Sequence, residues 1–181
     1  MVKLKKGVIH IGRGFAHVKG LGFILWRARH EFYHALLGVA WAWVLREVWN
    51  EFNVKWLILS VFASLLPDLE HLFYWVSEGY RDPYVKKIRS FVRNGEWRAV
   101  AMHIEKGHKD VTELSYHNIY VVIGLLVATG LCFLFDWNSW VVIFGAMVLH
   151  YLFDIADDVV TLGYLNTNWK RWGKGRKRKI R

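Results

Sequence analysis

The sequence predicts an all-α, polytopic membrane protein with about four transmembrane helices and a cytoplasmic amphipathic helical loop between the second and third. Apolar residues make up 54% of the 181 residues and include 11 Trp, which is more hydrophobic surface than a soluble domain of this length usually carries. Long apolar stretches match the thickness of a bilayer, and basic residues are distributed unevenly between the loops. The spans are expected near residues 32–49, 56–76, 117–135 and 139–163.

The last two spans give the clearest signal. Residues 119–135 carry no charge, and residues 137–153 contain His150 as their one ionisable side chain. The polar residues 136–139 between them are typical of a tight turn, so we expect a helical hairpin that crosses the bilayer twice. The turn also carries aromatic side chains of the kind enriched at membrane interfaces, Trp137 and Trp140.

The first two spans are apolar but are interrupted by ionisable side chains. Pro67 should kink the second span and free a backbone carbonyl near Asp68. The ionisable residues are His34, Arg46 and Glu47 in the first span, and Asp68, Glu70 and His71 in the second.

The segment between the second and third spans, residues 78–115, mixes 8 basic with 6 acidic residues. Its apolar residues Val85, Ile88 and Val92 recur at helical spacing, which indicates a solvated or interfacial amphipathic helix. Residues 1–165 are therefore expected to form a single integral membrane domain. Residues 166–181 contain 8 basic residues and no acid, which predicts a disordered basic tail.

The basic residues provide a test of membrane orientation. With four spans both termini lie on one side, and 23 of the 25 Lys and Arg residues then share that side with the central loop. The positive-inside rule makes this side cytoplasmic, in a cell or inner membrane. The net charge of +10 is thereby explained without nucleic acid, although the tail could still bind anionic lipid.

Acidic and imidazole side chains inside the predicted spans indicate a metal site. Each costs at least about 2.5 kcal/mol at mid-helix, so each needs a partner or a function. Measured along the helices at 1.5 Å per residue, most of them fall at a similar depth. Asp68 and His71 are spaced i,i+3, and His150 and Asp154 are spaced i,i+4, so each pair shares a helical face.

This donor set favours a divalent cation without thiolate ligands, because Cys132 is the only cysteine. Zinc fits best, manganese or iron is possible, and the number of donors allows one or two ions. A plainer alternative is that the polar residues pair only with one another inside the bundle. The histidines outside the spans, His10, His17, His103 and His108, are interpreted as surface residues.

A second motif uses some of the same residues. His30, Glu31 and His34 form a literal H-E-x-x-H, in which two histidines one turn apart bind zinc and the glutamate acts as general base. A chain of this kind would resemble the intramembrane zinc proteases, with Asp154 as the third ligand. That reading leaves several of the other buried ionisable residues unexplained.

The order of motifs resembles the YdjM-like family of membrane-bound metal-dependent hydrolases. The resemblance covers residues 34–154 and rests on the segments 34–38, 65–71 and 150–154, with a histidine that opens the third span. It implies metal-binding roles for His34, Asp68, His71, His117, His150 and Asp154.

The chain departs from the family pattern at two places. Glu70 stands where the family usually has Asp, and the paired-histidine segment keeps only its second histidine, His117. Glu113, one turn earlier, is a candidate for the lost ligand. We therefore expect a metal-dependent hydrolase with Glu70 or Glu31 as the proton acceptor, acting on a phosphoester or lipid-linked substrate at the cytoplasmic face. The alternatives are the zinc protease and a non-enzymatic metal-binding membrane protein.

Overall fold

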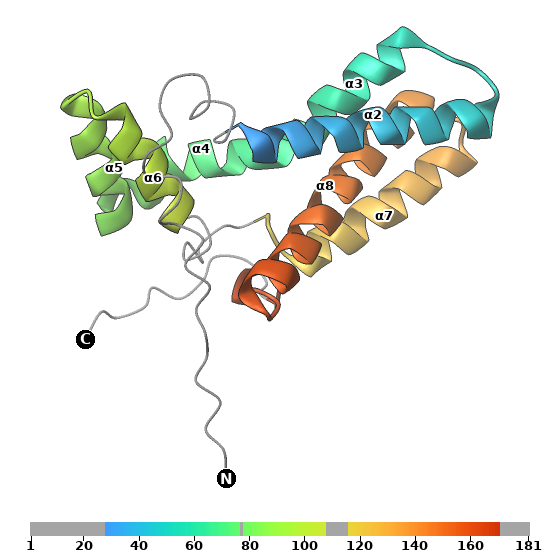
Figure 1. The fold of residues 1–181 in the computed structure, drawn as a ribbon. Helices are drawn as coiled ribbons and strands as arrows, with labels where there is room; N and C mark the ends of the chain where they lie inside the picture. Colours follow the sequence, from blue (N-terminus) through green and yellow to red (C-terminus); the bar gives the residue numbers. More distant parts are fainter. Residues whose placement is uncertain (1–27, 77, 108–115, 171–181) are drawn as a thin grey trace, which may run out of the picture.

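The computed structural model describes residues 28–76, 78–107 and 116–170, and within them the chain is helical without strands. The elements are α2 (Arg29–Trp49), α3 (Val54–Leu65), η2 (Leu66–Asp68), α4 (Leu69–Val76), η3 (Glu78–Arg81), α5 (Pro83–Arg93), α6 (Trp97–Gly107), α7 (Ile119–Leu134), α8 (Asn138–Leu162) and η5 (Thr167–Lys170). The helices α2, α3, α7 and α8 form a bundle, and α4 continues from α3 toward the α5–α6 pair, which lies apart from the bundle (Figure 1).

Two helical stretches are long and apolar enough to cross a membrane. They are residues 54–76, which join α3, η2 and α4, and residues 138–162 of α8. Helix α7 is apolar but shorter. The all-helical prediction is confirmed, whereas the arrangement of four crossings stays a prediction.

Small residues allow the bundle helices to approach closely. A Cβ added to Gly38 in α2 would lie 2.7 Å from Val61 Cα in α3, and one added to Gly145 in α8 would overlap the ring of Trp41 in α2. The Ser60 hydroxyl donates a hydrogen bond to the Gly38 carbonyl at 2.7 Å, which ties the same two helices together. Helix α2 is thereby held against both α3 and α8.

The second predicted span is broken where Pro67 was expected to break it. Helix α3 ends at Leu65, the 3₁₀ turn η2 follows, and α4 begins at Leu69. Proline has no backbone N–H and clashes with the preceding turn, so the regular ladder cannot continue through this point. The carbonyls of the last α3 turn consequently become available to other partners.

The central segment differs from its prediction in the number of helices and in the surroundings of His103. The central segment forms two helices, α5 and α6, instead of one; Val85 and Ile88 are buried as expected, but Val92 is 41% exposed. The ring of His103 is not a surface group, because it stacks on Tyr84 and its Nε2 is buried.

The predicted tail is also ordered at its beginning. Residues 166–170 carry the short helix η5, and Trp169 is buried against α8. Residues 171–181 lie outside the described residues, as do Glu113, His10, His17 and His108.

Candidate metal centre

Helix α2 contributes two histidines that face the same point. His30 and His34 lie one turn apart, and their Nε2 atoms are 3.0 Å from each other. The His34 side chain is fully buried, whereas the His30 side chain is 27% exposed. The close contact of Gly38 with α3, one turn further along, brings this end of α2 into the bundle.

Helix α8 presents His150 and Asp154 on one face, as their i,i+4 spacing predicts. His150 is fully buried, and its Nδ1 lies 2.6 Å from the carbonyl oxygen of Ser64. A carbonyl can only accept, so Nδ1 carries the proton and donates it. Ser64 belongs to the last turn of α3, and its carbonyl orients this imidazole. It is not the carbonyl that lacks the Pro67 N–H, which is that of Ala63 and accepts from the Leu66 N–H.

Asp68 lies between these two helices, in the 3₁₀ turn η2. Its Oδ1 is 3.9 Å from His150 Nε2, and its Oδ2 is buried without a hydrogen-bond partner. Ligand atoms of His30, His34 and Asp68 lie within 4.8 Å of one another, and so do those of His34, His150 and Asp154. Both groups have a geometry that could hold a metal ion.

His117 joins the cluster from the segment that precedes α7. Its Nδ1 lies 2.7 Å from Glu70 Oε2, while Glu70 Oε1 accepts a hydrogen bond from the Tyr116 backbone N–H at 2.8 Å. Asn118 fixes the start of α7 by accepting from the Val121 N–H. The buried His117 Nε2 is 3.6 Å from Asp154 Oδ2.

The remaining predicted residues lie at the edge of the cluster. His71 in α4 is half-buried, and its ring centroid is 5.1 Å from that of His117, but it belongs to neither metal-holding group. Glu31 is exposed next to His30. The ligand role of His71 and the base role of Glu31 stay predictions.

The centre can hold positive charge between its imidazoles and Asp154, either as a cation or as protons on the rings. His117 and His150 each direct the Nδ1 proton to an oxygen, so in the neutral ring Nε2 carries a lone pair. Both Nε2 atoms face Asp154 Oδ2, at 3.6 and 3.1 Å, and neither makes a hydrogen bond. Lone pairs facing a carboxylate repel it unless a cation, or a proton on the ring, lies between them.

One wall of the site was not predicted from the sequence. Trp169 of η5 donates a buried hydrogen bond from Nε1 to Asp158 Oδ2 at 2.8 Å. Its ring packs on Tyr151 and lies 5.9 Å from the ring of His117. The polar and basic residues of this segment predict a tail, although its two tryptophans, at positions 169 and 172, are a signal for an anchor.

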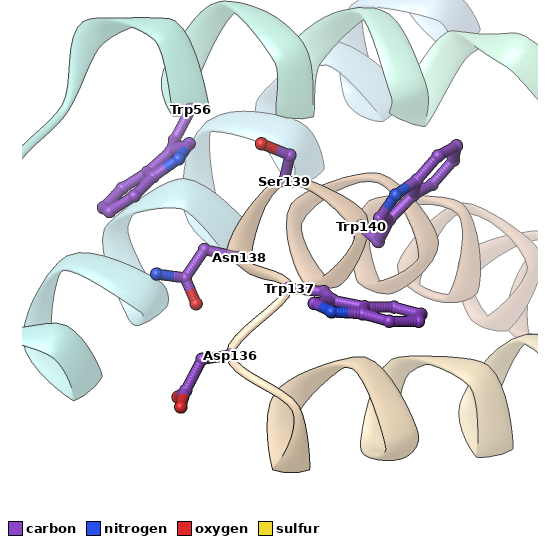
Figure 2. A pocket seen from close by; sticks show the side chains of 6 residues that line it. All are labelled: Trp56, Asp136, Trp137, Asn138, Ser139 and Trp140. Atoms are coloured by element: carbon purple, nitrogen blue, oxygen red, sulfur yellow. The ribbon is translucent and has the colours of Figure 1, made fainter.

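An open hollow at the other end of the bundle is separate from this cluster. It lies between the start of α3 and the turn that joins α7 to α8, as Figure 2 shows, and no histidine lines it. Trp137 and Trp140 are half-exposed or more, and their place in an aromatic belt stays a prediction. Its lining residues are Trp56, Asp136, Trp137, Asn138, Ser139 and Trp140.

No family model, curated protein or solved structure matches this chain. The function must therefore be argued from the site itself.

Proposed function

We propose that this protein is a membrane-embedded, metal-dependent hydrolase that acts on a phosphoester or lipid-linked substrate at the cytoplasmic face. The observation that carries the proposal is that an oxygen acceptor lies beside Nδ1 of both His117 and His150. In proteins, metal-binding imidazoles donate their second N–H to a carboxylate or a backbone carbonyl, which fixes the tautomer and aims the other nitrogen at the ion. Glu70 and the Ser64 carbonyl are such acceptors.

The membrane part of the proposal rests on exposed apolar surface. Of the two long apolar stretches, only 22% and 39% is buried inside the protein, unlike the core helix of a soluble domain. Helix α7 also exposes about half or more of several large aliphatic side chains along its length. These are Ile123, Leu126, Val127, Leu131 and Leu134. Such a surface is costly in water and stable in lipid.

Residues from four segments of the chain would bind the ion or lie beside it. His34, His150, Asp154 and Asp68 would hold the ion, with His117 beside them. Zinc suits imidazole and carboxylate donors without thiolate, and manganese or iron is also compatible. The ion, when bound, supplies Lewis acidity that activates water for hydrolysis.

Substrate selection follows from position. The cluster lies toward the end of the bundle that leads to α5 and α6, and α5 exposes Lys86, Lys87 and Arg93. Positive charge near a membrane-level site favours a phosphate-bearing headgroup or phosphoester. The YdjM-like resemblance, which covers residues 34–154, supports the same class of activity.

The zinc protease is a second candidate, because one observation favours it. Asp154 Oδ1 lies 3.6 Å from His30 Nε2 and 3.2 Å from His34 Nε2, as expected for the third ligand of an H-E-x-x-H site. We rank it second because it assigns no role to the inward-facing nitrogens of His117 and His150.

Elemental analysis of the detergent-purified protein tests the metal centre. We expect zinc, manganese or iron at about one ion per chain or more, and at least about tenfold weaker binding after His150→Ala, which removes a ligand. His103→Ala is the matched control, because its ring packs on Tyr84 away from the cluster and metal content should not change. Metal-free wild-type protein that stays metal-free after incubation with zinc would refute the proposal and favour simple pairing of the polar residues.

A further inference from the structure

The two carboxylate oxygens of Asp154 face different pairs of histidines. Oδ1 lies 3.2 Å from His34 Nε2 and 3.6 Å from His30 Nε2, both on α2. Oδ2 lies 3.1 Å from His150 Nε2 and 3.6 Å from His117 Nε2. One carboxylate therefore lies between two pairs of imidazole nitrogens, and the pairs adjoin because the rings of His34 and His150 stack with centroids 3.7 Å apart.

The donors are too many for one ion of ordinary coordination. Four imidazoles and the carboxylates of Asp68 and Asp154 converge here, whereas zinc in proteins is usually bound by four ligands. His34 belongs to both of the metal-holding groups, but its Nε2 has a single lone pair and can serve one ion only. His34 therefore cannot bind an ion in each group at the same time. If two ions bind, one of them must use other donors in place of His34.

We propose that Asp154 bridges two divalent cations, one bound with His30 and His34 and the other with His117 and His150. Asp68 is placed to complete either side, because it groups with the α2 histidines and its Oδ1 is 3.9 Å from His150 Nε2. This inference rests on the proposed function and adds to it the number of ions and the carboxylate that joins them. Paired ions about 3.5–4 Å apart are found in phosphatases and nucleases as well as in aminopeptidases, so a two-ion centre agrees with the proposed phosphoester substrate.

The outer hydrogen bonds of the imidazoles differ between the Oδ1 side and the Oδ2 side of Asp154. On the Oδ2 side, both imidazoles have an acceptor for Nδ1–H, namely Glu70 for His117 and the Ser64 carbonyl for His150. On the Oδ1 side, His34 Nδ1 is buried without a hydrogen-bond partner, and His30 is 27% exposed. Because outer partners change metal affinity by about 10–100-fold, the Oδ2 side should bind its ion more tightly.

Equilibrium dialysis of the full-length, chelator-stripped protein against Zn²⁺ in detergent tests the proposal. We expect two ions per chain, bound in two steps that differ by about tenfold or more in Kd. His30→Ala should remove the weaker ion and leave the tighter one, and His150→Ala should weaken the tighter one at least tenfold. Asp154→Asn should weaken both steps, because the amide cannot bridge as a carboxylate does. His103→Ala should leave two ions.

The outcomes separate this inference from the proposed function. One ion per chain in the wild type, lost to the same extent in His30→Ala and His150→Ala, would overturn the two-ion centre but keep a metal site. Two ions of which Asp154→Asn weakens only one would overturn the bridge. Absence of any bound ion would overturn both proposals. The wild-type stoichiometry decides the central point without relying on the folding of any variant.

Discussion

At the residue scale, the chemistry of the centre depends on what orients each imidazole. Glu70 was expected to act as a proton acceptor, but one of its oxygens is bonded to the Tyr116 N–H and the other to His117 Nδ1. A carboxylate held in this way is well suited to fix the tautomer and direction of a ligand. These contacts fit a positioning role for Glu70, and its role as proton acceptor stays a prediction.

The substitution Glu70→Gln separates the two roles. It keeps the size of the side chain but replaces a charged acceptor by an amide, so zinc affinity should fall by about 10–100-fold. Zinc dialysis checks this, and raising the zinc concentration should restore hydrolysis. Unchanged zinc affinity together with lost hydrolysis would instead support the base role.

The matched experiment at Glu31 distinguishes the two enzyme candidates. Because Glu31 is exposed and outside both metal-holding groups, Glu31→Gln should leave zinc affinity unchanged. In the phosphoester hydrolase it should change turnover less than Asp68→Asn does. Loss of peptide cleavage in Glu31→Gln, with little effect from Asp68→Asn, would favour the protease.

The sequence could predict the members of the centre better than their arrangement. The i,i+4 pair of His150 and Asp154 follows from helical geometry alone, because residues one turn apart share a face. The convergence of His30 with His117 depends on which helix faces meet in space. The contact of His150 with the Ser64 carbonyl is of the same kind, since no local pattern links residues so far apart.

At the element scale, the site depends on how closely α2 approaches α3. A Cβ on Gly38 would lie 2.7 Å from both Val61 Cα and Ser64 Oγ, and 2.8 Å from the Ser60 carbonyl oxygen. Two of these atoms belong to backbone and cannot turn aside. Any side chain at Gly38 must therefore push the two helices apart.

Gly38→Ala tests this contact. Overpacking of this kind costs typically about 1–3 kcal/mol, so the free energy of unfolding should fall by that amount, and zinc affinity should fall with it because His34 lies one turn away. Thermal unfolding in detergent and zinc dialysis measure the two effects. Gly130→Ala in α7 is the control, because nothing lies within 4 Å of its Cβ position and alanine favours helix. Equal stability of both variants would contradict the close contact.

The interruption of the second span and the division of the central loop show what local sequence can predict about elements. Pro67 acts through its missing N–H and its ring, so the break between α3 and α4 follows from local chemistry. The turn between α5 and α6 contains Asn94 and Gly95, with Gly95 at φ 69°. An Asn-Gly dipeptide is typical of a turn. The prediction of a single helix used only the spacing of the apolar residues and therefore missed this turn.

At the scale of the whole molecule, the charge distribution predicts an orientation in the membrane. The turn between α2 and α3 and the turn between α7 and α8 lie at one end of the bundle, and the α5–α6 pair lies beyond the other end (Figure 1). Arg46 and Lys55 lie near the first end, and in the sequence the other 23 of the 25 basic residues belong to the segments predicted to be cytoplasmic. Sequence predicts this sidedness, but the number of crossings depends on bundle geometry in lipid.

Cysteine labelling in intact cells tests the four-crossing arrangement. In a Cys132→Ser background, Glu51→Cys reports on the α2–α3 turn and Arg93→Cys on the end of α5, and both positions are exposed. A maleimide that cannot cross membranes should label Glu51→Cys in intact cells, and Arg93→Cys only after permeabilisation, because four spans place the two positions on opposite sides. Labelling of both positions from the same side would require an even number of crossings, or none, between them. The cluster would then no longer face the cytoplasm as the charge distribution predicts.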